Sequence, residues 1–195
     1  MKPIVTKKYL KLLVETSRQR VLEIFYRYPE KEFSLSELAK EAGVAKAHIG
    51  KILDELHKID FIEITKLSKI WRIKANQQNW SFIKSKIIYN LNFIYQSGLV
   101  EFLNEHFNNP KSISLFGSFR KGEDVSTSDI DIAVEIDEIE EYQTLFRLDE
   151  LVEFENLIKR KIQLHLFNKE NIDINVFNNI ANGIVLLGFL EVKPL

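Results

Sequence analysis

The chain has 195 residues, of which 45% are hydrophobic and 28% charged, proportions typical of a soluble globular protein with one or two apolar cores. Cysteine is absent, which excludes disulfides and thiol chemistry. The sequence contains no run of eighteen apolar residues, and its start lacks the apolar region of a signal peptide, so we expect a cytoplasmic protein with no membrane segment.

The net charge of −1 hides an asymmetry between the two halves of the chain. Residues 1–110 contain 18 Lys and Arg against 12 Asp and Glu, which gives +6. Residues 111–195 contain 9 against 16, which gives −7. A basic front half and an acidic back half predict two domains with different partners.

Hydrophobic periodicity in the first 76 residues predicts three helices followed by two strands. These elements are expected over residues 8–28, 34–43, 44–58, 61–65 and 70–74. Ser36 is the expected N-cap of the second helix, and Gly43 is expected to end it in a left-handed conformation. Three helices and a basic hairpin resemble a winged helix-turn-helix domain, which we assign to residues 1–76.

In the winged-helix fold the third helix enters the major groove and the hairpin tip contacts the nucleic-acid backbone. The candidate nucleic-acid-binding residues are Lys46, His48 and Lys51 near the start of the third helix, and Lys66 and Lys69 in the hairpin. This helix contains no arginine, the residue that commonly reads guanine, so the expectation is DNA or RNA binding through phosphates. The alternative is a module for protein contacts or dimerisation.

Residues 77–110 are expected to form a helical connector with helices over about 79–95 and 99–107. The apolar stripe predicted for its first helix consists of Trp80, Ile83, Ile87, Leu91 and Ile94. Such a connector either packs two domains together or forms a homodimer.

The segment Ser112 to Glu135 contains two short apolar strands, over 113–116 and 130–134, separated by a polar loop. Alternation along the second strand places Asp129 and Asp131 on one face and the intervening isoleucines on the other. Two carboxylates this close repel each other unless a cation lies between them, and oxygen ligands suit Mg²⁺. Gly117 and Ser118, which follow the first strand, add a backbone that can approach a phosphate closely and a hydroxyl donor.

Gly117-Ser118, the following Arg120-Lys121-Gly122, and Ser128-Asp129-Ile130-Asp131 resemble the signature of minimal nucleotidyltransferases of the DNA polymerase β-like superfamily, over about residues 111–190. The resemblance implies that Gly117, Ser118, Arg120 and Lys121 bind a nucleoside triphosphate, with ATP the first candidate. It also implies that Asp129 and Asp131 bind Mg²⁺ or Mn²⁺ while an acceptor hydroxyl attacks the α-phosphate.

The family usually has a third carboxylate on a later strand, and Gln163 occupies that position here. An amide can ligate a metal through its oxygen but cannot accept a proton as a carboxylate can. Three alternatives stay open: His165 does part of that work, the acceptor needs no base, or the site binds nucleotide without turnover. Glu135 lies on the same strand face, but too far along it to be a good substitute.

The rest of the chain is expected to form a helix over 140–159, a strand over 161–167, a helix over 171–181 and a strand over 184–187. The predicted fold class is α+β: a winged helix-turn-helix, a helical connector, and an α/β nucleotidyltransferase domain at 111–195 with a mixed sheet. Arg160 and His165 have the spacing of the catalytic motif of HEPN ribonucleases, but that motif requires a helix and this segment alternates like a strand.

Three functions from different classes follow. The first is a Mg²⁺-dependent nucleotidyltransferase acting on a hydroxyl of a protein, RNA or small molecule, with catalytic residues Asp129, Asp131 and Gln163. The second is a DNA-binding regulator whose nucleotidyltransferase domain binds nucleotide with little or no turnover. The third is an antitoxin, since such nucleotidyltransferases often have a HEPN-type toxin as partner.

Overall fold

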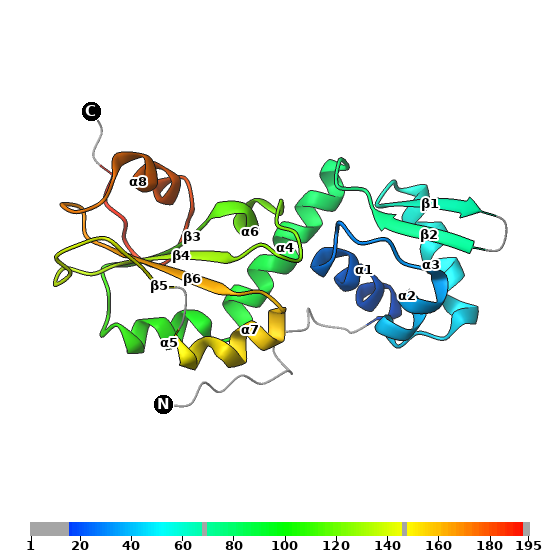
Figure 1. Cartoon of the computed structure of the whole chain (residues 1–195), viewed down its shortest axis with the longest axis horizontal. Coiled ribbons are helices and arrows are strands. Elements are labelled where there is room, and N and C mark those ends of the chain that lie inside the picture. Colours follow the sequence, from blue (N-terminus) through cyan, green and yellow to red (C-terminus); the bar gives the residue numbers. More distant parts are fainter. Residues whose placement is uncertain (1–15, 68–69, 146–147, 193–195) are drawn as a thin grey trace. The chain divides into compact units, whose positions relative to one another are not determined.

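The structure is a computed structural model that describes residues 16–67, 70–145 and 148–192 (Figure 1). It divides into two compact units, which we call the N-terminal unit (within Lys11–Tyr89) and the C-terminal unit (within Asn90–Leu195). The division falls inside helix α4 (Trp80–Gln96), and the predicted three-part arrangement with a separate connector stays a prediction. None of the helices in the described ranges has the length and apolarity needed to cross a membrane.

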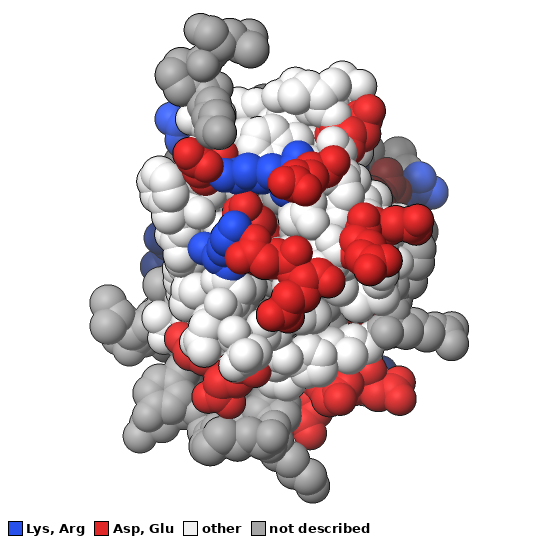
Figure 2. All heavy atoms as spheres, turned by 90° about the vertical axis from the view of Figure 1, so that its left-hand side faces the viewer, with Lys and Arg blue, Asp and Glu red and all other residues white. Residues whose placement is uncertain are grey.

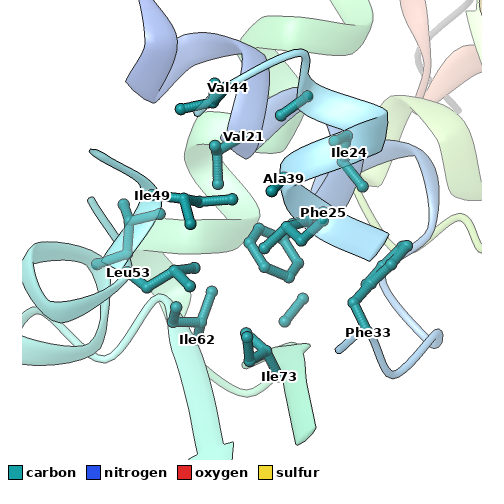
Figure 3. Close-up of a cluster of buried hydrophobic side chains, with 14 of the residues drawn as sticks. Val21, Ile24, Phe25, Phe33, Ala39, Val44, Ile49, Leu53, Ile62 and Ile73 are labelled. Carbon is teal, nitrogen blue, oxygen red and sulfur yellow. The ribbon is translucent and has the colours of Figure 1, made fainter. Parts of the chain in front are cut away.

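The N-terminal unit has the predicted winged-helix arrangement, with three helices followed by an antiparallel hairpin. Its elements are α1 (Ser17–Arg27), α2 (Leu35–Ala42), α3 (Lys46–Lys58), β1 (Ile62–Leu67) and β2 (Ile70–Ala75). Thr16 caps α1 by accepting a hydrogen bond from Gln19 N, so the helix begins later than predicted, and residues 8–15 lie outside the described ranges. Figure 3 shows Val21, Phe25, Ile49, Leu53, Ile62 and Ile73 converging on one apolar core.

The second helix begins at a different serine from the predicted one. Ser34, not Ser36, is the N-cap, and its hydroxyl accepts from Glu37 N while Glu37 Oε2 accepts from Ser34 N. This reciprocal capping box satisfies two backbone donors that a helix start leaves free. Gly43 ends α2 with φ of 60°, as predicted.

The buried positions of α4 share only Ile94 with the predicted stripe. Trp80 is 62% exposed, and Ile83, Ile87 and Leu91 are half-buried. The buried positions are Phe82, Lys86, Asn90, Phe93 and Ile94. Both sets have helical spacing, and α4 carries apolar residues on more than one side, so periodicity could not choose between the faces. Two polar residues therefore lie on the buried face.

The C-terminal unit is a five-stranded mixed sheet with helices on both faces, in agreement with the predicted fold class (Figure 1). Strand order is β5-β6-β4-β3-β7, where only the β4–β6 pair is parallel. Its strands are β3 (Ser112–Phe116), β4 (Ile130–Glu135), β5 (Gln143–Leu145), β6 (Ile162–Phe167) and β7 (Ile184–Gly188). Its helices after α4 are α5 (Leu99–His106), α6 (Gly117–Lys121), α7 (Val152–Ile158) and α8 (Ile174–Ala181), with a 3-10 turn at Asp149–Leu151.

One predicted helix is wrong in its first half. Residues 140–159 were expected to be helical throughout, but the chain forms strand β5 over Gln143–Leu145 and becomes helical only from Asp149. β5 pairs with β6, which completes the edge of the sheet. Tertiary pairing has therefore overridden a local pattern that fits a helix.

Candidate active site

Both aspartates of the predicted metal pair lie at the start of β4. Asp129 directly precedes this strand and Asp131 is its second residue; both are half-buried. Ile130 and Ile132 have no exposed surface, so the predicted alternation is confirmed. The carboxylate of Asp131 thus lies on the opposite face of the strand from these two core isoleucines.

Gly117 is required at its position for two reasons. Its φ of +74° lies in the left-handed region, and a Cβ built on it would lie 2.0 Å from Asp131 Oδ2. The close approach follows from the antiparallel pairing of Phe116 with Asp131, which places the turn after β3 beside that carboxylate. Gly117 and Asp131, fourteen positions apart in the sequence, therefore lie side by side.

Gln163 joins this site through the sheet, because β4 and β6 are parallel and pair Asp131 with Gln163. Gln163 and Asp129 also line a cavity of about 460 Å³. Its lining includes Leu148, Asp149, Val152 and Glu155. In the described ranges, no three His, Cys, Asp or Glu side chains form a metal-binding group.

Glu135 does not replace that carboxylate. It is buried, its Oε2 accepts a hydrogen bond from Ser112 Oγ at 2.9 Å, and Lys169 Nζ lies 3.9 Å from its Oε1. These contacts hold it at the far end of β4, as the sequence indicated.

His165 lies close to Asp131. Its Nε2 is 3.5 Å from Asp131 Oδ1, and its Nδ1 is 2.5 Å from Tyr142 Oη. The predicted strand here is confirmed, so Arg160 and His165 lack the helix that the HEPN motif requires. The contact with Tyr142 was not predicted, because residues 140–159 were expected to be helical.

Three buried polar side chains support the loop between α6 and β4, and no sequence pattern predicted their contacts. The Asn90 amide donates to Phe119 O at 2.8 Å and to Asp124 Oδ1 at 2.9 Å. Asp124 Oδ2 also pairs with Arg160 Nη2 at 3.3 Å, and both side chains are at most 2% exposed. This ion pair joins the loop that precedes Asp129 to the start of β6, which carries Gln163.

The other predicted nucleotide-binding residues, Arg120 and Lys121, lie in the last turn of α6; Arg120 is half-buried and Lys121 exposed. Basic side chains there also complement the helix carbonyls, so their positions suit a purely structural role as well.

The predicted nucleic-acid contacts lie at the surface of the N-terminal unit. Lys46, His48 and Lys51 are exposed on α3. Lys66 is exposed on β1, with its Nζ 4.1 Å from the ring centre of Trp71. Lys69 lies outside the described ranges.

The donor set at the candidate site fits a hard divalent cation. Asp129 and Asp131 offer carboxylate oxygens and Gln163 a carbonyl oxygen, the ligand types that Mg²⁺ prefers together with substrate phosphates. Gly117 leaves the space beside Asp131 Oδ2 free of a side chain.

Comparison with known proteins finds similarity in the C-terminal unit. Residues 98–188 match the family described as Polymerase beta, Nucleotidyltransferase. A protein of Methanocaldococcus jannaschii named "Putative protein adenylyltransferase MJ1215" is 44% identical over 54 residues, which is 28% of this chain. The match spans 60% of that relative's length.

Solved structures similar to this chain include regulators of transcription. MepR of Staphylococcus aureus is 13% identical with a TM-score of 0.38, over 49% of this chain and 70% of its own. The adhesin competence repressor AdcR of Streptococcus pyogenes is 12% identical with a TM-score of 0.34, over 48% and 68%. At these scores the likeness carries no argument about function.

Proposed function

We propose that the C-terminal unit is a metal-dependent nucleotidyltransferase that transfers an NMP group from a nucleoside triphosphate, with ATP the first candidate, to a hydroxyl group. The observation that carries this proposal is the packing of Gly117 against Asp131, with Gln163 paired to Asp131 on the next strand. The match of residues 98–188 to nucleotidyltransferases supports it.

Each part of the site has a role in this reaction. Asp129 and Asp131 would hold Mg²⁺ or Mn²⁺, with Gln163 as a neutral oxygen ligand, and a cation held there would supply positive charge beside the phosphates. Gly117 and Ser118 hold the triphosphate with backbone N–H groups and a hydroxyl, and Arg120 and Lys121 add positive charge beside them.

The reaction joins the acceptor oxygen to the α-phosphorus, breaks the bond from that phosphorus to the bridging oxygen, and releases pyrophosphate. The acceptor hydroxyl loses a proton in this step. Because Gln163 cannot take the proton, we expect transfer to be slow or restricted to acceptors that ionise readily.

The acceptor is a protein, RNA or small-molecule hydroxyl. The name of the archaeal relative favours a protein. The exposed acidic run Asp137, Glu138, Glu140 and Glu141 belongs to the C-terminal unit, and Figure 2 shows that acidic side chains dominate the charged surface of one of its faces. Such a surface repels a phosphate backbone, which also favours a protein over RNA.

Calorimetry with ATP and Mg²⁺ tests the proposal. The wild type should bind the nucleotide only with the metal present, and Asp129→Asn and Asp131→Asn should each weaken binding by about 100-fold or more. Radiolabelled ATP then shows whether label moves to the protein itself or to added acceptors. Equal affinity in wild type and both variants would contradict the proposal.

A second candidate is a nucleotide-binding regulator without turnover, and Gln163 at the third carboxylate position is the observation that favours it. In that case metal-dependent binding is retained but no label is transferred. An antitoxin role, a HEPN-type toxin partner and a homodimer belong to this candidate as predictions.

We also propose that the N-terminal unit binds DNA or RNA through phosphates, because α3 exposes Lys46, His48 and Lys51 on one stretch of its surface. Affinity of the full chain should fall steeply with salt, since each neutralised phosphate releases counterions. Absence of any shift at low salt would favour a protein-contact module instead.

A further inference from the structure

Three side chains near the edge of the sheet form a hydrogen-bonded chain that ends at His165, whose other ring nitrogen faces Asp131. Thr144 Oγ1 donates to Tyr142 Oη at 3.3 Å, and Tyr142 Oη lies 2.5 Å from His165 Nδ1. His165 Nε2 faces Asp131 Oδ1 at 3.5 Å. The chain exists because β5 pairs antiparallel with β6 and sets Thr144 opposite His165.

The imidazole at the centre of this chain is buried. His165 is 8% exposed, and the Phe116 ring packs against it edge-on with centroids 4.9 Å apart. Nε2 is shielded from solvent, and no described atom lies within hydrogen-bonding geometry of it. A buried donor without a partner is costly, so a slightly shorter approach of Asp131 Oδ1 would satisfy both groups.

The neighbours of the two ring nitrogens favour one tautomer. Asp131 Oδ1 is a carboxylate oxygen and can only accept a hydrogen bond, so Nε2 can satisfy it only by carrying the hydrogen. Nδ1 then accepts from the Tyr142 hydroxyl, which in turn accepts from Thr144 Oγ1. Such a ring offers Asp131 a neutral donor.

The two oxygens of Asp131 thus face different neighbours. Oδ1 faces His165, while Oδ2 faces Gly117, where a Cβ would lie 2.0 Å away. A hydrogen bond to Oδ1 leaves Oδ2 directed at the turn that precedes Ser118. With the neutral Gln163 in place of a third carboxylate, the orientation of each remaining carboxylate has a larger effect on metal binding.

We propose that Thr144, Tyr142 and His165 form a relay that orients Asp131 for metal and nucleotide. His165 and Tyr142 are positioning residues, because they act through Asp131 and not on the reacting atoms. This inference rests on the proposed nucleotidyl transfer, but its first test does not require nucleotide.

The first test is the tautomer of His165, read from the nitrogen chemical shifts of its ring by NMR in slightly alkaline buffer. The wild type and Tyr95→Phe, a matched control at an exposed tyrosine of α4, should show hydrogen on Nε2. Tyr142→Phe should shift the ring toward hydrogen on Nδ1 or a mixture. Hydrogen on Nδ1 in the wild type would overturn the relay whether or not the protein binds nucleotide.

The second test is Mg²⁺·ATP affinity by calorimetry. Tyr142→Phe and His165→Leu should weaken it by about 10-fold or more, the usual effect of losing a residue that supports a metal ligand, and His165→Gln, which keeps a donor, should restore part of it. Thermal unfolding shows whether each variant is folded. If His165→Leu fails to fold, Tyr142→Phe still tests the relay, because it removes only one oxygen atom. Unchanged affinity in Tyr142→Phe would overturn the relay, whereas absence of metal-dependent binding in the wild type would overturn the proposed function.

Discussion

In the N-terminal unit the described interior is apolar, with Lys86 as its one buried charged side chain, whereas the described residues of the C-terminal unit include eight buried polar or charged ones. These eight are Asn90, Ser97, Ser112, Ser114, Asp124, Glu135, Arg160 and His165. In the N-terminal unit the candidate functional residues of α3 are exposed, and the apolar core fixes the helix that carries them. The candidate site in the C-terminal unit lies beside buried polar groups such as the Asp124–Arg160 pair. Removing one partner of such a group is costly, because the other is left buried in a medium of low dielectric constant.

The largest expected effect is on that buried network. Asp124→Ala leaves Arg160 buried without its carboxylate partner, and we expect the free energy of unfolding to fall by about 3–5 kcal/mol in urea denaturation. The matched control is Glu63→Ala, which breaks the exposed pair with Lys74 and should cost less than about 1 kcal/mol. Similar losses in both variants would remove the contrast between the two units.

Replacing a glycine by alanine should change the free energy of unfolding in opposite directions in the two units. Gly117→Ala introduces a Cβ at positive φ against Asp131 and should lower stability by about 1–3 kcal/mol and weaken Mg²⁺·ATP binding. Gly50 is a helical residue of α3, and a Cβ there would have no atom within 4 Å. Gly50→Ala should therefore raise stability by about 0.5–1 kcal/mol. Thermal unfolding and calorimetry of both variants measure this; normal binding by Gly117→Ala would argue against the close approach.

A third carboxylate can be introduced at the candidate site by replacing Gln163. Gln163→Asp, paired with Asp131 across β4 and β6, should raise label transfer by about tenfold, because a carboxylate there tightens metal binding and accepts a proton. Gln143→Asp adds the same charge at an exposed position of β5 and should change little. Transfer by the wild type that Gln163→Asp abolishes would show that the amide has its own role.

The surface of α3 is tested by salt dependence. The double variant Lys46→Ala/Lys51→Ala should bind nucleic acid more weakly and should reduce the slope of log affinity against log salt by roughly 2. Lys58→Ala/Lys84→Ala removes the same charge from exposed positions elsewhere in the unit. If both pairs change the slope equally, binding follows net charge and not this face of α3.

The smallest expected effect concerns the capping box. Ser34→Ala should lower the free energy of unfolding by about 1 kcal/mol, whereas Ser36→Ala, at the serine predicted from the sequence, should change it by less than about 0.5 kcal/mol.

The hydrogen bonds from the Ser34 backbone and side chain lower the pKa of Glu37. A lowered carboxyl pKa stabilises the fold at neutral pH, and this contribution is lost as the pH falls through and below glutamate's ordinary pKa of about 4.3. Glu37→Gln should flatten that part of the pH profile in chemical denaturation.

The sequence by itself determined the features that depend on local spacing. Alternation in β4 places Asp129 and Asp131 opposite the core, periodicity gives α3 its buried residues, and Gly43 ends α2 as a glycine in a left-handed conformation does. Each of these follows from backbone geometry over a few neighbouring residues, which a single sequence records.

Only the tertiary structure decided the features that depend on strand pairing or on a choice between equivalent faces. Residues 143–145 form an edge strand because β6 offers an unpaired edge, and this pairing brings Tyr142 and Thr144 to His165. The buried face of α4 and the Asp124–Arg160 pair likewise depend on partners far away in the sequence. Local periodicity contains no information about such partners, because the free energy of pairing and burial arises only when the segments meet.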